Sequence, residues 1–282
     1  MSEQGVVVHL AYDWMIVAYF FFGGLSAGAY LFSVAANYWR QEYRHLAKKS
    51  AAISMVALGI GMLILILDLG QPLRVWRLFI TSNMRSPVVW GVWFLNIFLV
   101  LNFFYNALMF LGKNDEAKKV AYIGSPFAVL AATYTAMLLA HSPAKALWHT
   151  SLLPVLFLNG AIISGIALVM LVSVRQQDLQ LLSKLGKFVA WLVIFELGMT
   201  LAEVIILYTG GTESIAAAKS LFSGQIGCLF LGVEIVLGSI IPVVILMRNK
   251  ASVFTQALAS LLILIGIFAM RYVIVIGGQL IS

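Results

Sequence analysis

Five carboxyl groups that lie within or beside long apolar stretches are the first candidates for chemistry in this sequence. They are Asp13, Asp68, Glu196, Glu203 and Glu234. An ionisable group inside a membrane costs roughly 2.5–3.5 kcal/mol on the insertion scale, so each needs a physical reason to be there. A carboxylate at the mouth of a lipid-accessible pocket can accept the proton released when a quinol hydroxyl is oxidised. The alternative for Asp13 and Asp68 is a helix cap or a surface ion pair with Arg74 or Arg77.

The three glutamates favour a different chemistry. Glu196 and Glu203 are seven residues apart, so on one helix they face the same side at a distance of about 10 Å along the axis. Glu234 lies near the middle of the next apolar stretch. If all three point inward, they form a discontinuous polar track that indicates a route for protons. The alternative is that each is protonated and hydrogen-bonds to a neighbouring helix.

The histidines do not favour haem, because a membrane-bound b-type haem takes its axial ligands from within apolar spans. All four lie at the ends of the apolar stretches or between them: His9, His45, His141 and His149. His141 is expected at the same membrane depth as Asp68, either as a cap or as part of one site. Tyr134, two turns earlier, has a hydroxyl that suits a quinone carbonyl; the alternative is a core tyrosine bonded to the backbone.

Other site chemistries find no support in the sequence. There is no GxxxxGK[ST] phosphate loop, no HExxH and no CxxC, which argues against nucleotide use and a metal held by this protein. The single cysteine, Cys228, cannot supply the ligands of an iron–sulfur cluster. A metal redox centre is therefore expected in another subunit.

The composition places these residues in a membrane protein. Of the 282 residues, 62% are hydrophobic and 10% are charged, against roughly 45–50% and about 25% in soluble domains. The mean hydropathy is +1.00 over the whole chain, which excludes a water-soluble globular protein. The net charge of +7 is explained by basic cytoplasmic loops rather than by binding of nucleic acid.

Eight apolar stretches are long enough to cross a bilayer, which takes about 20 residues. They run over about 14–38, 50–67, 88–111, 120–140, 151–174, 188–208, 221–247 and 251–275. They are too long for transmembrane strands and show no alternation. The sequence therefore predicts an all-α, multi-pass integral membrane protein.

The basic residues predict the orientation of these helices. Connections after the first, third, fifth and seventh stretches hold twelve lysines and arginines, and those after the second, fourth and sixth hold five. Because short cytoplasmic loops are the more basic ones, both termini are expected on the outer, periplasmic side. The external connections, about 68–87, 141–150 and 209–220, are where a partner or a reaction is expected.

Several motifs resemble the NrfD/polysulfide reductase family of membrane subunits. They are Tyr19–Ala29, with Gly24 and Gly28 in a spacing typical of close helix packing, Asp68–Trp76, and Ser86–Pro87 with Trp90–Gly91. The family patterns are close to YLFLGGLAAGA, DLGRPxRFW and NxxSPMxWG; Gln71 and Val88 depart from them. Trp148–Phe157, Arg271–Val273 and Gly278–Gln279 also resemble family signatures, so the similarity extends over all eight stretches.

The resemblance implies a haem-less, quinone-reactive anchor built as two four-helix bundles, residues 1–140 and 141–282. Such a subunit binds exchangeable menaquinone or ubiquinone in its first bundle, near the outer surface. Its partners are a ferredoxin-like iron–sulfur subunit with four clusters and a molybdopterin catalytic subunit or multihaem cytochrome. The implied location is the inner (cytoplasmic) membrane of a bacterium or archaeon.

Transferred to this sequence, the resemblance makes Asp68 the proton acceptor and Tyr134 the hydrogen-bond donor to the quinone. Asp13, Tyr19 and His141 are further candidates for this site. The loop facing the partner would contain Arg74, Arg77 and Asn83. Two alternatives stay open: a secondary transporter, although no convincing internal repeat is visible, and a structural anchor without quinone chemistry.

Overall fold

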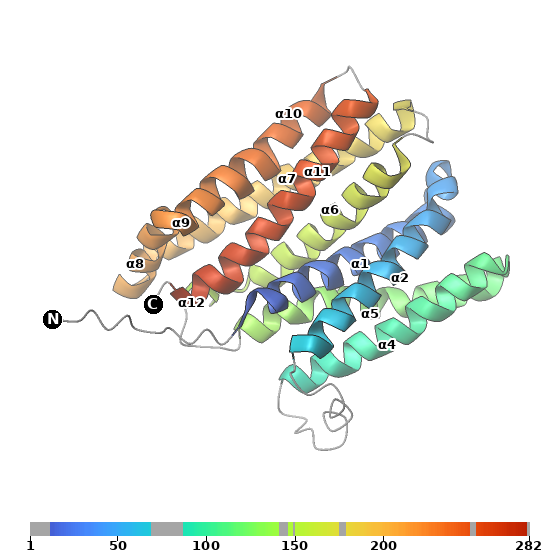
Figure 1. Ribbon diagram of the computed structural model, residues 1–282, viewed down its shortest axis with the longest axis horizontal. Coiled ribbons are helices and arrows are strands. Elements are labelled where there is room, and N and C mark those ends of the chain that lie inside the picture. Colours follow the sequence, from blue (N-terminus) through green and yellow to red (C-terminus); the bar gives the residue numbers. More distant parts are fainter. Residues whose placement is uncertain are drawn as a thin grey trace.

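The computed structural model describes residues 12–68, 87–140, 146–148, 150–174, 179–248 and 252–280. Within these ranges every regular element is a helix and no strand occurs (Figure 1). Eight helical segments in this part of the chain are long and apolar enough to cross a membrane. The prediction of an all-α membrane protein with eight spans is confirmed.

The first five spans are single helices. They are α1 (Trp14–Tyr38), α2 (Arg44–Asp68), α4 (Pro87–Phe110), α5 (Asn114–Ala140) and α6 (Leu153–Ser173). The sixth span is α7 (Leu179–Thr209), followed by the short α8 (Thr212–Leu221). The seventh consists of α9 (Gly224–Gly227), a π-helix (Cys228–Ile240) and α10 (Ile241–Met247). The eighth consists of α11 (Val253–Tyr272), a π-helix (Val273–Gly277) and α12 (Gly278–Leu280).

Three helices begin earlier than their apolar stretches indicate. α2 begins at Arg44 instead of about 50, α5 at Asn114 instead of about 120, and α7 at Leu179 instead of about 188. The additional turns carry charges, which end a hydropathy signal but not a helix. In α5, Asp115 and Glu116 lie in the first turn, where acidic groups interact favourably with the helix dipole.

The connection expected over 209–220 contains a short helix, α8 (Thr212–Leu221). Its buried residues Ala217, Ala218 and Leu221 lie on one face, as in an amphipathic helix that packs against a larger body. A ten-residue helix has no span-length apolar signal, and for that reason the hydropathy pattern did not reveal it.

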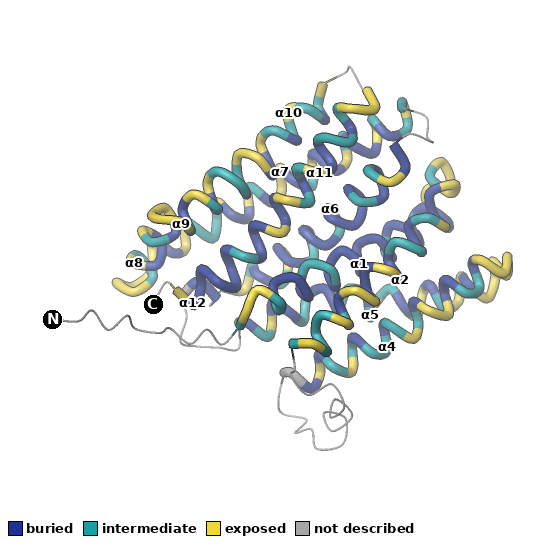
Figure 2. The backbone as a smooth tube through the Cα atoms, viewed as in Figure 1, coloured by how far each residue is buried: buried dark blue, intermediate teal, exposed yellow. Residues whose placement is uncertain are grey.

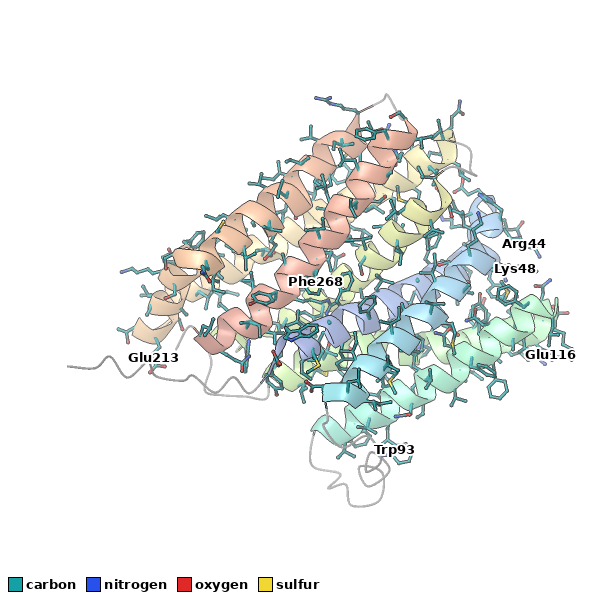
Figure 3. All side chains as sticks on the ribbon, in the orientation of Figure 1. Arg44, Lys48, Trp93, Glu116, Glu213 and Phe268 are labelled. Carbon is teal, nitrogen blue, oxygen red and sulfur yellow. The ribbon has the colours of Figure 1, made fainter. Side chains whose placement is uncertain are left out.

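The spans run alternately up and down, so their ends gather at two ends of the molecule. We call the end where α1 begins and α12 ends the terminal end, and the other the basic end. Arg44 and Lys48 lie at the basic end with Glu116, whereas Glu213 lies at the terminal end (Figure 3). That the terminal end faces the periplasm remains a prediction from the loop charges.

Helix α1 is the most centrally packed element, and Figure 2 shows it buried along most of its length. It contacts α2, α5, α6 and α11. A Cβ atom at Gly28 would collide with the backbone carbonyl of Ala161 on α6, and one at Gly165 with the backbone of Ala29. The predicted packing role of Gly28 is confirmed. The division into two bundles at residue 140 stays a prediction.

Serine side chains fasten α1 to α2. Ser26 donates a hydrogen bond to the carbonyl oxygen of Ser54 at 2.8 Å, Ser33 to that of Ala47 at 2.7 Å, and Ser50 to that of Ala29 at 2.6 Å. Gly24–Gly28 also has the GxSxG pattern of hydrolase nucleophiles. Ser26 is fully buried inside a helix, so here the pattern serves packing and not nucleophilic attack.

Candidate functional site

Two tyrosines that the sequence analysis predicts as site residues are in contact near the terminal end. The hydroxyl oxygens of Tyr19 on α1 and Tyr134 on α5 are 2.6 Å apart, and either can be the donor. Tyr19 is only 2% exposed. A Cβ atom at Gly91 of α4 would overlap the ring of Tyr134, so the absent side chain makes room for that ring. The pair therefore lies where α1, α4 and α5 converge.

The hydrogen bonding of this pair leaves one proton free. In a bond between two hydroxyls one group donates and the other accepts, so the accepting group keeps a hydrogen to offer. Within the described residues neither hydroxyl makes a second hydrogen bond. The pair can therefore donate one hydrogen bond to an oxygen atom of a bound molecule.

The two aspartates lie at helix ends at the same end of the molecule as this pair. Asp13 precedes α1 with an extended backbone, and its side chain accepts a hydrogen bond from the Trp14 amide. It is thus a helix cap, which is one of the alternatives left open by the sequence. Asp68 is the last residue of α2 and is partly buried. The two carboxyl groups are close enough to interact electrostatically.

The remaining candidates of this region lie outside the described residues. They are His141, Arg74, Arg77 and Asn83. The predicted surface ion pair of Asp68 with either arginine falls there too. Their roles in binding or in partner contact stay predictions from the resemblance.

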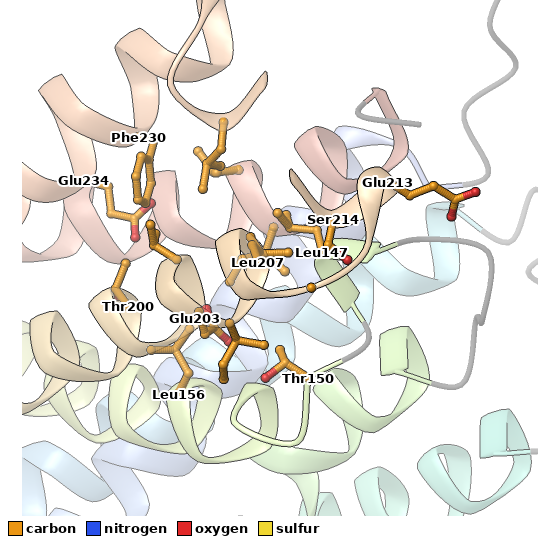
Figure 4. A pocket seen from close by; sticks show the side chains of 16 residues that line it. Leu147, Thr150, Leu156, Thr200, Glu203, Leu207, Glu213, Ser214, Phe230 and Glu234 are labelled. Atoms are coloured by element: carbon orange, nitrogen blue, oxygen red, sulfur yellow. The ribbon is translucent and has the colours of Figure 1, made fainter. Parts of the chain in front are cut away.

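The three glutamates lie in the carboxy-terminal half, where two of them line a cavity of about 360 Å³. Glu203 on α7 and Glu234 on the π-helix line it, together with Thr200 and Glu213. Figure 4 shows Glu203 and Glu234 on different helices, whereas the Glu213 side chain points away. A smaller cavity of about 10 Å³ shares Thr200 and Glu234 and is also lined by Glu196.

The hydrogen-bonding capacity of these three carboxyl groups is only partly used. Glu196 and Glu234 are 5% and 8% exposed, and Glu203 is partly buried. One carboxyl oxygen of each has no hydrogen-bonding partner among the residues that the structure describes. A buried polar atom without a partner is costly unless it is protonated or reached by water. The arrangement suits groups that exchange protons with water in the cavity.

A buried arginine, which the sequence analysis noted only as part of a family signature, adjoins Glu196. Arg271 on α11 is fully buried, and its guanidinium carbon lies 4.6 Å from the ring centroid of Phe157. One of its nitrogens contacts Gly24 on α1, where a Cβ atom would collide with it. Glu196 interacts with it electrostatically. The signal that could have identified it is a lone cation within an apolar stretch.

The π-helix that carries Glu234 is a second feature without a clear sequence signal. It extends over Cys228–Ile240, and Ser239 donates a hydrogen bond to the carbonyl oxygen of Glu234 at 3.0 Å. π-helical turns are rare and are frequent at functional sites. The helix also approaches α11 closely, since a Cβ atom at Gly238 would collide with the backbone of Gly266.

Comparison with known proteins decides the family. The family profile described as "Polysulphide reductase, NrfD" matches residues 4–282. The chain belongs to the NrfD family. It is 28% identical to the C chain of polysulfide reductase from Wolinella succinogenes, over 96% of this sequence and 95% of that protein. It is 25% identical to protein NrfD of Escherichia coli, over 96% of both sequences, and 24% identical to the C subunit of selenate reductase from Mesobacillus selenatarsenatis, over 98% and 76%.

Membership of the NrfD family and the eight apolar helices identify a multi-pass integral membrane protein. Among the described residues of this NrfD-family protein, no three His, Cys, Asp or Glu side chains lie close enough together to hold a metal ion.

Proposed function

We propose that this protein is the membrane anchor and quinone-reactive subunit of a respiratory oxidoreductase complex. In this role it exchanges electrons between membrane menaquinone or ubiquinone and an iron–sulfur subunit. The observation that carries the proposal is the buried Tyr19–Tyr134 pair, with one hydroxyl proton to donate. Asp68 lies at the same end of the molecule, where α2 ends, and interacts electrostatically with Asp13. The relatives named as parts of polysulfide and selenate reductases support the oxidoreductase context.

In the proposed site each residue has a distinct task. The Tyr19–Tyr134 pair binds and orients a quinone oxygen through the free hydroxyl proton. Asp68, at the end of its helix, accepts a proton and passes it to water. A bound quinol supplies two electrons and two protons on oxidation. Asp13 caps α1 and adds a nearby negative charge.

The partner proposed for the terminal end is a ferredoxin-like subunit with four clusters. It connects this protein to a molybdopterin catalytic subunit or a multihaem cytochrome in the periplasm. The residues Arg74, Arg77 and Asn83 contribute to the contact, by resemblance. The loop charges support an orientation with the terminal end outside, in the inner membrane of a bacterium or archaeon.

Replacing Tyr134 with phenylalanine is the direct test of quinone binding. The variant loses one hydroxyl and leaves Tyr19 without its partner. A hydrogen bond of this kind contributes about 0.5–1.5 kcal/mol, so we expect about three- to tenfold weaker binding of a short-chain quinone, measured by titration of the purified complex.

Tyr208→Phe is the matched control, because Tyr208 is exposed near the same end of the other half. It should bind quinone like the unchanged protein. If the unchanged complex binds no quinone, the proposed function is wrong, and the two alternative functions, a structural anchor or a transporter, stay open. Equal binding by Tyr134→Phe and the unchanged protein would remove the tyrosine pair from the site.

A proton route through Glu203, Glu234 and Glu196 is a second proposal, supported by the two adjoining cavities that these residues line. Glu203→Gln removes a proton-exchanging group and keeps its size. We therefore expect fewer protons moved per electron in vesicles containing the complex, with quinol turnover retained.

The control for this measurement is Glu116→Gln, an exposed position at the basic end. It should leave the ratio of protons to electrons unchanged. An unchanged ratio in Glu203→Gln and in Glu234→Gln would exclude the route.

A further inference from the structure

A cavity at the basic end is not used by the proposed quinone site. It has a volume of about 490 Å³ and lies where α1 and α4 end and α2 and α5 begin. We call it the basic pocket and define it by Asn37, Arg44, His45, Lys48, Met109 and Asn114. Figure 3 shows Arg44 and Lys48 at this end, far from Glu213 at the terminal end.

The walls of the basic pocket favour an anion. Arg44, His45 and Lys48 come from the first two turns of α2, which has no acidic residue in its first turn. Cations at the N-terminus of a helix are repelled by the positive end of the helix dipole. A bound anion would reduce this repulsion. Among the described residues, no carboxylate lines the pocket and no ion pair includes these three basic side chains.

The acidic residues near this end of the molecule do not neutralise the basic side chains of the pocket. Glu116 forms an ion pair with Lys113 at 3.6 Å. Glu42 precedes α2, and Asp115 interacts electrostatically with Tyr38 at the end of α1. The lining itself combines three basic side chains with the side-chain amide of Asn114, a donor set that suits phosphate oxygens. The amide of Asn37 donates a hydrogen bond to the Met109 sulfur at 3.3 Å and so forms part of the wall.

Aromatic residues place the basic pocket at the depth of lipid head groups. The rings of Tyr38 and Tyr122 stack with centroids 6.3 Å apart, and Trp39 donates a hydrogen bond to the Tyr122 hydroxyl at 3.3 Å. Trp39 is 66% exposed. Tryptophan and tyrosine gather at the membrane–water interface, so the pocket opens at that level rather than in the aqueous phase.

Exposed apolar side chains follow the pocket wall at the end of α4. Met109 forms part of this wall, and the next residues, Phe110 and Leu111, are 63% and 71% exposed. Such residues suit contact with acyl chains. A ligand with a phosphate at one end and hydrocarbon at the other matches the lining and its surroundings.

We propose that the basic pocket binds the phosphate head group of an anionic phospholipid. Arg44 and Lys48 donate to phosphate oxygens, Asn114 binds the polar backbone of the lipid, and the acyl chains pass over Phe110 and Leu111. Basic pockets between transmembrane helices are suited to such head groups. The site is independent of the proposed quinone chemistry.

The test compares lipid retention by charge variants of the whole complex. The complex is purified in detergent, exposed to vesicles of phosphatidylcholine with or without cardiolipin, and the retained lipid is measured by mass spectrometry. In Arg44→Gln/Lys48→Gln we expect at least fivefold less retained cardiolipin. The Arg44→Lys/Lys48→Arg variant keeps both charges and should retain at least half.

The matched control is Lys184→Gln/Arg248→Gln, which removes two exposed charges from the same end but outside the pocket. It should retain cardiolipin like the unchanged complex. An equal loss in both Gln variants would show diffuse attraction and overturn the site. Competition by inorganic phosphate at the same phosphorus concentration would overturn the lipid assignment in favour of a soluble anion.

Discussion

Replacing Asp68 with asparagine is expected to lower quinol-dependent reduction of the partner's clusters by at least a hundredfold while the complex still assembles. Positioned acid–base groups contribute about 10²–10⁴-fold to a rate, and asparagine keeps the shape of the side chain but cannot accept the proton. Asp68 ends α2 and is only partly buried, so folding should not depend on it. The measurement is single-turnover cluster reduction by quinol, with assembly followed by size-exclusion chromatography.

A comparison with Asp13→Asn separates the two neighbouring acids. Asparagine caps a helix about as well as aspartate, so this variant keeps the cap of α1 and removes only its charge. We expect a loss of less than about threefold, because a charge that only neighbours the acceptor adds little when water screens it. Asp115→Asn at the basic end is the remote control. Full activity of Asp68→Asn would remove the proton-acceptor role.

Replacing Gly28 with leucine is expected to prevent stable insertion of the fold. Even a Cβ atom at this position would collide with the carbonyl of Ala161, and the contacted Gly165 has no space on its side. Overpacking a core costs about 1–3 kcal/mol and occasionally more. Here the obstacle is backbone, which cannot rotate away, so we expect the upper end of that range or beyond. Membrane yield of the complex should fall at least tenfold.

The matched control for Gly28→Leu is Gly59→Leu in α2. A Cβ atom at Gly59 would meet nothing within 4 Å, so the added side chain can extend outward from the helix. This variant should insert and assemble at the level of the unchanged protein. Normal yield of Gly28→Leu would contradict the close contact between α1 and α6.

The site was predictable in part. Asp68, Tyr19 and Tyr134 could be identified from residue type and from family motifs, but their proximity could not. Tyr19 and Tyr134 are 115 residues apart, and their contact depends on how α1 and α5 are rotated toward each other. Arg271 was visible as a cation in an apolar stretch, yet its contacts with Phe157 and Gly24 follow from the packing of three helices.

The sequence alone determined the class of protein, the eight spans and the family, because hydropathy and local motifs do not depend on distant neighbours. It also identified the intramembrane carboxyl groups, since charge is a property of each residue. Only the tertiary structure decided that Glu203 and Glu234 share a cavity and that three residues of α2 enclose a pocket with α1, α4 and α5. Helix rotation and crossing set these contacts, and they depend on packing across the whole membrane domain.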